Sequence, residues 1–398
     1  MIQRNEYINI LSGSGDKQII KVISGVRRCG KSTLLELYCE HLLSRGVSRE
    51  QIIFINFEDI AFEHLQNYRA LYDHIMSRLL KNRMNYIFLD EIQHVTDFEK
   101  TVDSLFIKKN TDIYITGSNA YFMSGELATL LSGRYIEVKM LPLSFREYCA
   151  GTDGKIPVSQ KYIQYLENSS FPYTLQYEGR TQLIRNYLDS LYNTVLIKDV
   201  IARYKISDVM MLQSVTRFIF DNIGSPLSIS KIAGTMTSAG RKIDYKTVEK
   251  YVRALVDSLI VYQANRYNIK GRQHLKTLEK YYVVDIGLRY MLLGKHKTDI
   301  GHILENVVYL ELLRRGYDVY IGQSGSREVD FVAMNGDGIT YFQVAASVRD
   351  ENTLRRELGS LQSINDNYPK IILTLDEDPV AEYDGIKRVN ALDWLLQE

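Results

Sequence analysis

The residues from Gly25 to Ser32 have the types and spacing of a phosphate-binding loop. They fit the pattern G-x-x-x-x-G-K-[ST], follow a β-branched run at residues 19–23, and precede leucines at helical spacing. The glycines let successive N–H groups converge on one phosphate, and a helix that begins near Lys31 adds its dipole. A chance glycine-rich turn before an ordinary helix is the alternative. The residues expected to contact the nucleotide are Gly25, Val26, Arg27, Arg28, Cys29, Gly30, Lys31, Ser32 and Thr33.

Two side chains of this loop and two later carboxylates have the chemistry of ATP hydrolysis. Lys31 would reach the β- and γ-phosphates, and the Ser32 hydroxyl would ligate Mg²⁺. The apolar run at residues 86–89 ends in Asp90 and Glu91, and acids at that end of a buried strand lie at the edge where open α/β sheets bind ligands. We expect Asp90 to be the Mg²⁺ partner of Ser32 and Glu91 to orient the attacking water. A strand that ends in two solvated acids is the alternative.

A third predicted strand, residues 112–116, ends in small polar residues. From this position the side chain of Ser118 or Asn119 could hydrogen-bond the γ-phosphate or the attacking water, and Asn119 is therefore a candidate catalytic residue. A turn in which the asparagine caps a helix is the alternative, and both roles can hold together.

These motifs, in this order, resemble one bacterial and archaeal group of AAA+-type P-loop ATPases, which pair an N-terminal ATPase core with a C-terminal domain of unknown function. The resemblance implies ATP binding and hydrolysis on an AAA+-like sheet. It also implies a sensor or finger role for Arg134, in cis or in trans, whereas a surface arginine beside Glu137 is the alternative. The residues that carry the resemblance are 24–33, 89–93, 115–119, 131–135, 141–148, 280–288 and 328–331.

The elements that must position these residues predict an α/β protein. We expect an AAA+-like parallel sheet with helices on both faces over residues 1–150, closed by a turn-rich break at 151–157. Helical periodicity over 158–223 predicts a helical lid or linker, which we assign to residues 151–223. Residues 224–299 have the pattern of a winged helix-turn-helix, and residues 300–398 that of a second α/β domain.

Residues 241–280 form a basic stretch in a chain whose net charge is only +1. They contain ten Lys or Arg and four Asp or Glu, which is the charge asymmetry expected of double-stranded DNA binding. Lys246, Lys250 and Arg253 share one face of the predicted recognition helix. A winged helix that contacts other domains or proteins through a solvated basic face is the alternative.

The order of helix, hairpin and acidic strand in residues 300–398 resembles the restriction-endonuclease fold. Glu305, Asp330 and Gln343 match the positions that bind metal in active members, but Ala345 occupies the position of the activating lysine. The resemblance therefore implies a degenerate, binding domain, and nuclease activity is not expected.

Bulk composition sets the remaining expectations. With 45% hydrophobic and 24% charged residues, three cysteines without metal-ligand spacing and no apolar run of 18 residues, the chain is expected in the cytoplasm and not in a membrane. The sequence favours a Mg²⁺-dependent ATPase that couples nucleotide state to a DNA or protein partner, with self-association left open. A nucleotide-dependent regulatory module with negligible turnover is the alternative, and an ATP-gated nuclease is the least favoured.

Overall fold

The computed structural model describes residues 2–117, 131, 133–177, 179–295 and 300–397. The chain forms two compact units, Met1–Pro142 and Leu143–Glu398. No helix in the described part of the chain is long and apolar enough to cross a membrane.

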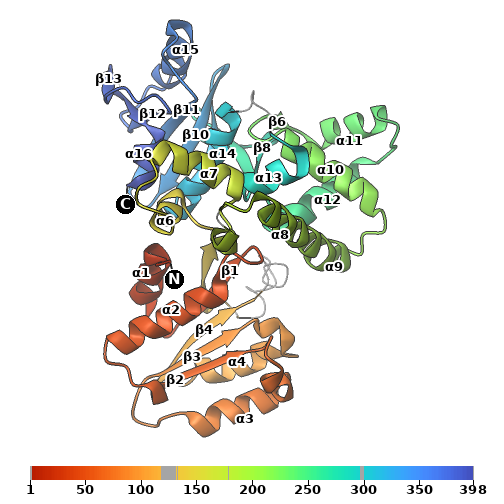
Figure 1. Ribbon diagram of the computed structural model, residues 1–398, viewed down its shortest axis with the longest axis vertical. Coiled ribbons are helices and arrows are strands. Elements are labelled where there is room, and N and C mark those ends of the chain that lie inside the picture. The colour runs from red at the N-terminus through yellow and green to blue at the C-terminus, as the bar shows by residue number, and fades with distance from the viewer. Residues whose placement is uncertain (1, 118–130, 132, 178, 296–299, 398) are drawn as a thin grey trace. The chain divides into compact units, whose positions relative to one another are not determined.

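Unit 1 is built on a five-stranded parallel sheet with the strand order β2-β3-β4-β1-β5 (Figure 1). Its strands are β1 (Ile20–Gly25), β2 (Ile52–Asn56), β3 (Asn85–Asp90), β4 (Thr111–Thr116) and β5 (Tyr135–Met140). Its main helices are α1 (Asn5–Ser14), α2 (Lys31–Ser44), α3 (Tyr68–Arg78) and α4 (Phe98–Phe106). The predicted α/β sheet with helices on both faces is confirmed.

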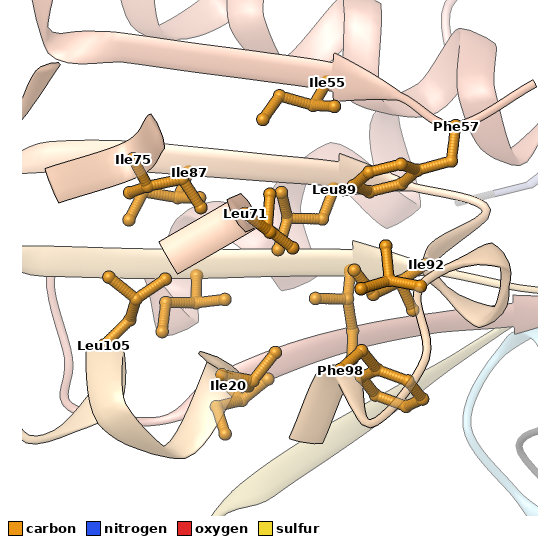
Figure 2. Close-up of a cluster of buried hydrophobic side chains, with 14 of the residues drawn as sticks. Ile20, Ile55, Phe57, Leu71, Ile75, Ile87, Leu89, Ile92, Phe98 and Leu105 are labelled. Atoms are coloured by element: carbon orange, nitrogen blue, oxygen red, sulfur yellow. The ribbon is translucent and has the colours of Figure 1, made fainter. Parts of the chain in front are cut away.

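Side chains alternate between the two faces of this sheet. On one face, Ile87 and Leu89 of β3 pack with Leu71 of α3 and with Phe98 and Leu105 of α4, and all five are buried (Figure 2). Burying each such side chain contributes about 1.5–3 kcal/mol, so this face holds the sheet and its two covering helices together. The central strands are buried on both faces because helices cover both, which explains their continuous apolar runs.

The opposite face, under α2, mixes aromatic and charged side chains. Tyr38 of α2 lies 5.2 Å from Tyr114 of β4 between ring centroids. Lys21 of β1 forms a buried ion pair with Asp112, and the Tyr114 hydroxyl donates to the same carboxylate at 2.8 Å. Burial lowers the pKa of Lys21, and the charge of Asp112 acts in the opposite direction. This network orients α2 on the strand that leads into the phosphate loop.

Unit 2 contains a nine-stranded sheet with the order β13-β14-β12-β11-β10-β9-β7-β8-β6. Its strands are β6 (Pro226–Leu227), β7 (Val261–Asn268), β8 (Gln273–Val283), β9 (Asp318–Ser324), β10 (Arg327–Asn335), β11 (Gly338–Ala345), β12 (Lys370–Thr374), β13 (Ala381–Tyr383) and β14 (Ile386–Asn390). Its α-helices are α6 (Phe145–Ala150), α7 (Val158–Asn168), α8 (Thr181–Thr194), α9 (Ala202–Tyr204), α10 (Val209–Asp221), α11 (Ile229–Ser238), α12 (Tyr245–Asp257), α13 (Ile286–Leu293), α14 (Ile300–Arg314), α15 (Glu351–Gln362) and α16 (Ala391–Leu396).

One strand pair joins the predicted helix-turn-helix segment to the C-terminal segment. The hairpin β7–β8 follows α11 and α12, and β7 pairs in parallel with β9 through Arg266 opposite Ile321. The backbone hydrogen bonds of one sheet therefore continue across the predicted boundary at 299/300. The finer division of unit 2 into three domains stays a prediction.

The motif at residues 280–288 has a structural role at its centre. Asp285 caps α13 through the Leu288 N–H at 2.6 Å, and its other oxygen accepts from the Ser170 N–H and hydroxyl at 2.7 and 2.6 Å. A Cβ at Gly287 would lie 2.7 Å from backbone atoms of Ser169, so only glycine allows this close approach. The motif thus anchors α13 on the turn that follows α7.

Candidate functional site

The carboxyl ends of three strands of unit 1 lie side by side because β1, β4 and β3 are parallel neighbours. Their last residues are Gly25, Thr116 and Asp90, and parallel strands present their carboxyl ends at the same edge of a sheet. The predicted phosphate loop and the predicted carboxylates therefore share one edge. This edge is the candidate site.

The phosphate loop is held close to β5. Gly25 pairs with Met140, and a Cβ on Gly25 would lie 2.4 Å from the Met140 carbonyl oxygen, a distance that excludes any other residue. Arg28 and Gly30 adopt left-handed conformations with φ of 65° and 105°. Immediately after Gly30, α2 begins at Lys31, so its free N-terminal N–H groups face the loop.

Lys31 is a buried cation with a single weak partner. Its side chain is 5% exposed, and its Nζ donates to the Gly25 carbonyl at 3.2 Å. Among the described residues, no carboxylate lies within ion-pair distance of this ammonium. Because a buried charge is costly without a counter-ion, Lys31 is suited to bind an anionic ligand.

Asp90 carries the matching unsatisfied acceptor. It is fully buried, and its Oδ1 accepts a hydrogen bond from the Thr116 hydroxyl. Oδ2 has no hydrogen-bond partner in the described part of the chain. Burial raises the pKa of Asp90, whereas the hydroxyls of Thr116 and Ser32 and the charge of Lys31 act in the opposite direction. Oδ2 of Asp90 is thus a buried carboxylate oxygen without a hydrogen-bond donor, and the Ser32 hydroxyl is close enough to affect the pKa of the same group. Carboxylate and hydroxyl oxygens of this kind are suitable ligands for Mg²⁺.

Glu91 is positioned by two residues that sequence reasoning missed. Its φ of 52° is left-handed, and its N–H donates to the Thr116 hydroxyl oxygen at 3.0 Å. Its carboxylate accepts from Gln93 Nε2 at 2.5 Å. Thr116 ends a strand next to β3, and Gln93 lies two residues after Glu91, so their positions in the sequence could have indicated a role beside the site. Threonine and glutamine are not residue types that by themselves indicate catalysis, and the sequence analysis therefore did not select them.

The structure does not bring Arg134 to this edge. Arg134 directly precedes β5, and its carbonyl accepts from the N–H of Ile20, the first residue of β1. It therefore lies at the opposite edge of the sheet, roughly 16 Å along β1 from the phosphate loop. Its guanidinium is exposed and lies 5.3 Å from the centre of the Phe106 ring. Asn119 lies outside the described residues.

A second group of predicted residues meets in unit 2. Glu305, Asp330, Gln343 and Ala345 line one cavity of about 780 Å³, and Lys280 of β8 reaches into the same cavity. Lys280 Nζ lies 2.9 Å from carboxylate oxygens of Glu305 and Glu328 and 3.8 Å from one of Asp330. Lys280 thus does not contribute to a basic surface. Sequence reasoning counted it in the 241–280 stretch because the partner carboxylates come from α14 and β10.

The charges of this cluster compensate one another. Burial lowers the pKa of Lys280, but the surrounding carboxylates, Glu305 foremost, outweigh it and raise the pKa above its usual value. Burial and the charge of Glu305 raise the pKa of Asp330 to about 8. The described residues hold no cluster of three His, Cys, Asp or Glu side chains that could bind a metal ion. An internal ammonium therefore occupies the centre of the acidic group.

The basic face of α12 is exposed as the sequence predicts. Val248, Val252 and Leu255 are buried on one side of the helix. The side chains on the other side are exposed; they are Lys246, Lys250 and Arg253. Arg253 forms a loose ion pair with Asp257 at 3.7 Å, and the other two carry no ion pair with a described residue.

The arrangement in unit 1 defines a P-loop nucleotide-binding fold, and comparisons with known proteins agree. Residues 17–149 match the family model of an AAA domain, and residues 159–299 match a domain of unknown function (DUF8612). The chain is 39% identical to an uncharacterized protein of Haemophilus influenzae, covering 100% of this chain and 99% of that protein. It belongs to the family of this protein, and within it residues 17–149 are an AAA+-type P-loop domain.

More distant similarities extend across domains of life. The chain is 28% identical to the uncharacterized protein MJ1544 of Methanocaldococcus jannaschii, over 87% of this chain and 79% of that protein. Among solved structures, the Walker-type ATPase PABY2304 of Pyrococcus abyssi is 16% identical with a TM-score of 0.48, covering 73% of this chain and 96% of that one. Cdc6p from Pyrobaculum aerophilum is 13% identical with a TM-score of 0.29, covering 65% and 86%.

Proposed function

We propose that unit 1 binds Mg²⁺-ATP and hydrolyses it, and that nucleotide state is coupled to a partner of unit 2. One observation supports this most directly. Among the described residues, the ammonium of Lys31 has no anionic partner and Oδ2 of Asp90 has no hydrogen-bond donor, and both lie at one edge of the sheet. A phosphate chain with its Mg²⁺ satisfies both needs at once.

The roles of the chain's own residues follow from their positions. The loop N–H groups and the N-terminus of α2 bind the phosphates, and Lys31 neutralises their charge. Ser32 and Asp90 would hold the Mg²⁺, whose chemistry is to neutralise charge that develops on the phosphate oxygens. Glu91 orients the attacking water, and Thr116 fixes both carboxylates by contacting the Asp90 side chain and the Glu91 backbone.

The test separates binding from turnover. Calorimetry with MgATP should show saturable binding by the parent protein and by Glu91→Gln, because the amide leaves the phosphate contacts intact. Phosphate release should fall at least about a hundredfold in Glu91→Gln, because an amide does not orient water as a carboxylate does. An exposed acid of the same unit, Glu63, provides the control variant Glu63→Gln. Parent-level turnover by Glu91→Gln would assign Glu91 a structural role.

The second candidate is a nucleotide-dependent module with negligible turnover, and one observation favours it. The Glu91 carboxylate is already engaged by Gln93, which leaves it less able to orient water in this state. The two candidates differ in Gln93→Ala. Turnover rises in this variant if hydrolysis is held back by that hydrogen bond, and stays negligible if the module does not hydrolyse ATP.

The partner we propose for unit 2 is double-stranded DNA, contacted through the exposed basic face of α12. The support is the helix-turn-helix order of α11 and α12, followed by the hairpin β7–β8, together with the exposure of three basic side chains on one helix face. A protein partner on the same winged-helix segment is the alternative. The absence of duplex binding at low salt, with MgATP present, would favour that alternative.

A further inference from the structure

Arg4 is a buried cation that contacts the phosphate loop and the end of β5 at once. It directly precedes α1 and is 3% exposed. Its guanidinium donates to the Cys29 carbonyl at 3.2 Å and to the Leu141 carbonyl at 2.8 Å, with the Pro142 carbonyl at 3.5 Å. One side chain therefore bridges the loop expected to bind ATP and the last residues of unit 1.

Tyr7 reinforces the same bridge from the first turn of α1. Its hydroxyl accepts the Leu141 N–H at 3.0 Å, and its buried ring lies 4.9 Å from the Arg4 guanidinium carbon. Arg4 and Tyr7 thus bind the carbonyl and the N–H of one residue, Leu141. Because both side chains are buried and start from a regular helix end, the position of Leu141 is tightly linked to that of α1.

The chemistry of this contact requires an arginine. A planar guanidinium presents donors in several fixed directions, so it can satisfy carbonyls from two separate segments. A lysine donates from one point and would hold either Cys29 or Leu141 well, but not both. The contact also lies beside the tight pairing of Gly25 with Met140, so the loop and the β5 end are linked at two places.

We propose that Arg4 and Tyr7 form a clamp that transmits the state of the phosphate loop to the backbone at Leu141 and Pro142, where unit 1 ends. The inference rests on the proposed nucleotide binding. When phosphates draw the loop N–H groups toward them, the Cys29 peptide reorients, and the guanidinium that binds its carbonyl follows. The nucleotide-bound and nucleotide-free loops then differ in their contact with Arg4, which is the differential interaction that coupling requires.

Hydrogen exchange at Leu141 measures this coupling directly, because its N–H is bound by Tyr7. Peptides that span residues 138–145 are followed by mass spectrometry with and without saturating MgATP, and calorimetry on the same samples reports binding. In the parent protein, we expect exchange at Leu141 to change at least about threefold on nucleotide addition. In Arg4→Gln that change disappears at saturating MgATP, even where affinity is reduced, and Arg4→Lys restores part of it.

Two further variants make the test decisive. Arg69→Gln replaces an exposed arginine of the same unit and should keep the full change. Tyr7→Phe keeps the ring over Arg4 and removes only the hydroxyl, so it should reduce the change even where Arg4→Gln fails to fold. Binding without any change at Leu141, or a full change in both clamp variants, would overturn the clamp while nucleotide binding stands. A parent protein that binds no MgATP would overturn the proposed function and, with it, the clamp.

Discussion

Lys31 of unit 1 and Lys280 of unit 2 are both buried, but the charges around them differ. Within the described part of the chain, Lys31 of unit 1 has only a backbone carbonyl as partner, and one oxygen of the nearby Asp90 has no hydrogen bond. Lys280 of unit 2 is surrounded by three carboxylates. One cation remains available to a ligand, whereas the other is neutralised by its own chain.

The difference shows what distinguishes a binding site from an internal ion cluster. In unit 1, the buried charges of Asp90 and Lys31 destabilise the folded protein because described residues do not compensate them. A phosphate and a metal ion that bind there would compensate both charges and stabilise the protein. In unit 2 any incoming cation must displace Lys280 first. The cavity around Lys280 therefore supports the degenerate, non-nuclease expectation, which remains a proposal.

The largest expected effect comes from removing the internal cation. Lys280→Ala should reduce the free energy of unfolding of unit 2 by about 3–5 kcal/mol, because it leaves the buried Glu305 carboxylate, and the half-buried Glu328 beside it, without a counter-ion. The measurement is urea unfolding followed by Trp394, the only tryptophan of the chain, which lies in α16 of unit 2. Lys250→Ala on the exposed face of α12 is the matched control. Equal midpoints for the two variants would refute the comparison.

Lys31→Ala should have the reverse profile. ATP binding should fall by about a hundredfold or more, which corresponds to about 2.7 kcal/mol, because no other loop side chain places a cation on the β- and γ-phosphates. The stability of the nucleotide-free protein should hold or rise, since a buried charge without a counter-ion has been removed. Calorimetry and thermal unfolding measure the two effects, with the exposed Lys81→Ala as control. Unchanged nucleotide affinity would contradict the proposed site.

The two lysines also differ in how far the sequence could predict them. Lys31 belongs to a contiguous motif in which every role is set by local spacing, and its strand and helix could be predicted from β-branched and helical periodicity. Lys280 takes its role from α14 and β10, more than twenty positions away, and only tertiary packing brings those residues together. Arg4 was missed for the same reason, because its partners are backbone carbonyls that carry no sequence signal.

Arg134 differs from these residues because the register of a strand, and not a side-chain contact, decides where it lies. Its Leu-Ser-Gly-Arg motif directly precedes a strand, and the residue before a strand of a parallel sheet lies at the amino edge, whereas ligands bind at the carboxyl edge. The register of β5 against β1 places it there. Any catalytic role of Arg134 would have to serve a neighbouring copy, and the finger role in trans stays a prediction.

The acidic cluster of unit 2 should also make stability depend on pH. The pKa of Asp330 is raised to about 8 by burial and Glu305, so the folded chain holds a proton that the unfolded chain releases near pH 4. Because the folded state binds more protons in this window, the stability of unit 2 should fall as pH rises from about 5 to 8. Asp330→Asn, which can still accept the Val344 N–H, should flatten that slope. Parallel slopes in Trp394-monitored unfolding would contradict this assignment.

The smallest expected effect concerns the exposed cations of α12. They are neither buried like Lys31 nor surrounded by carboxylates like Lys280. If they meet duplex DNA, each neutralised phosphate releases condensed counter-ions, so affinity should fall steeply with salt. Replacing Lys246, Lys250 and Arg253 together by Ala should flatten the slope of log affinity against log salt by up to about three units. The change is smaller if the ion pair with Asp257 already neutralises part of the charge of Arg253. Fluorescence anisotropy at two or more salt concentrations, with MgATP present, measures the slope.

A matched triple variant on exposed cations of unit 1, Lys81, Lys109 and Lys139, should leave this slope unchanged. Equal slopes for the parent protein and the α12 variant would exclude this face as the contact and favour a protein partner.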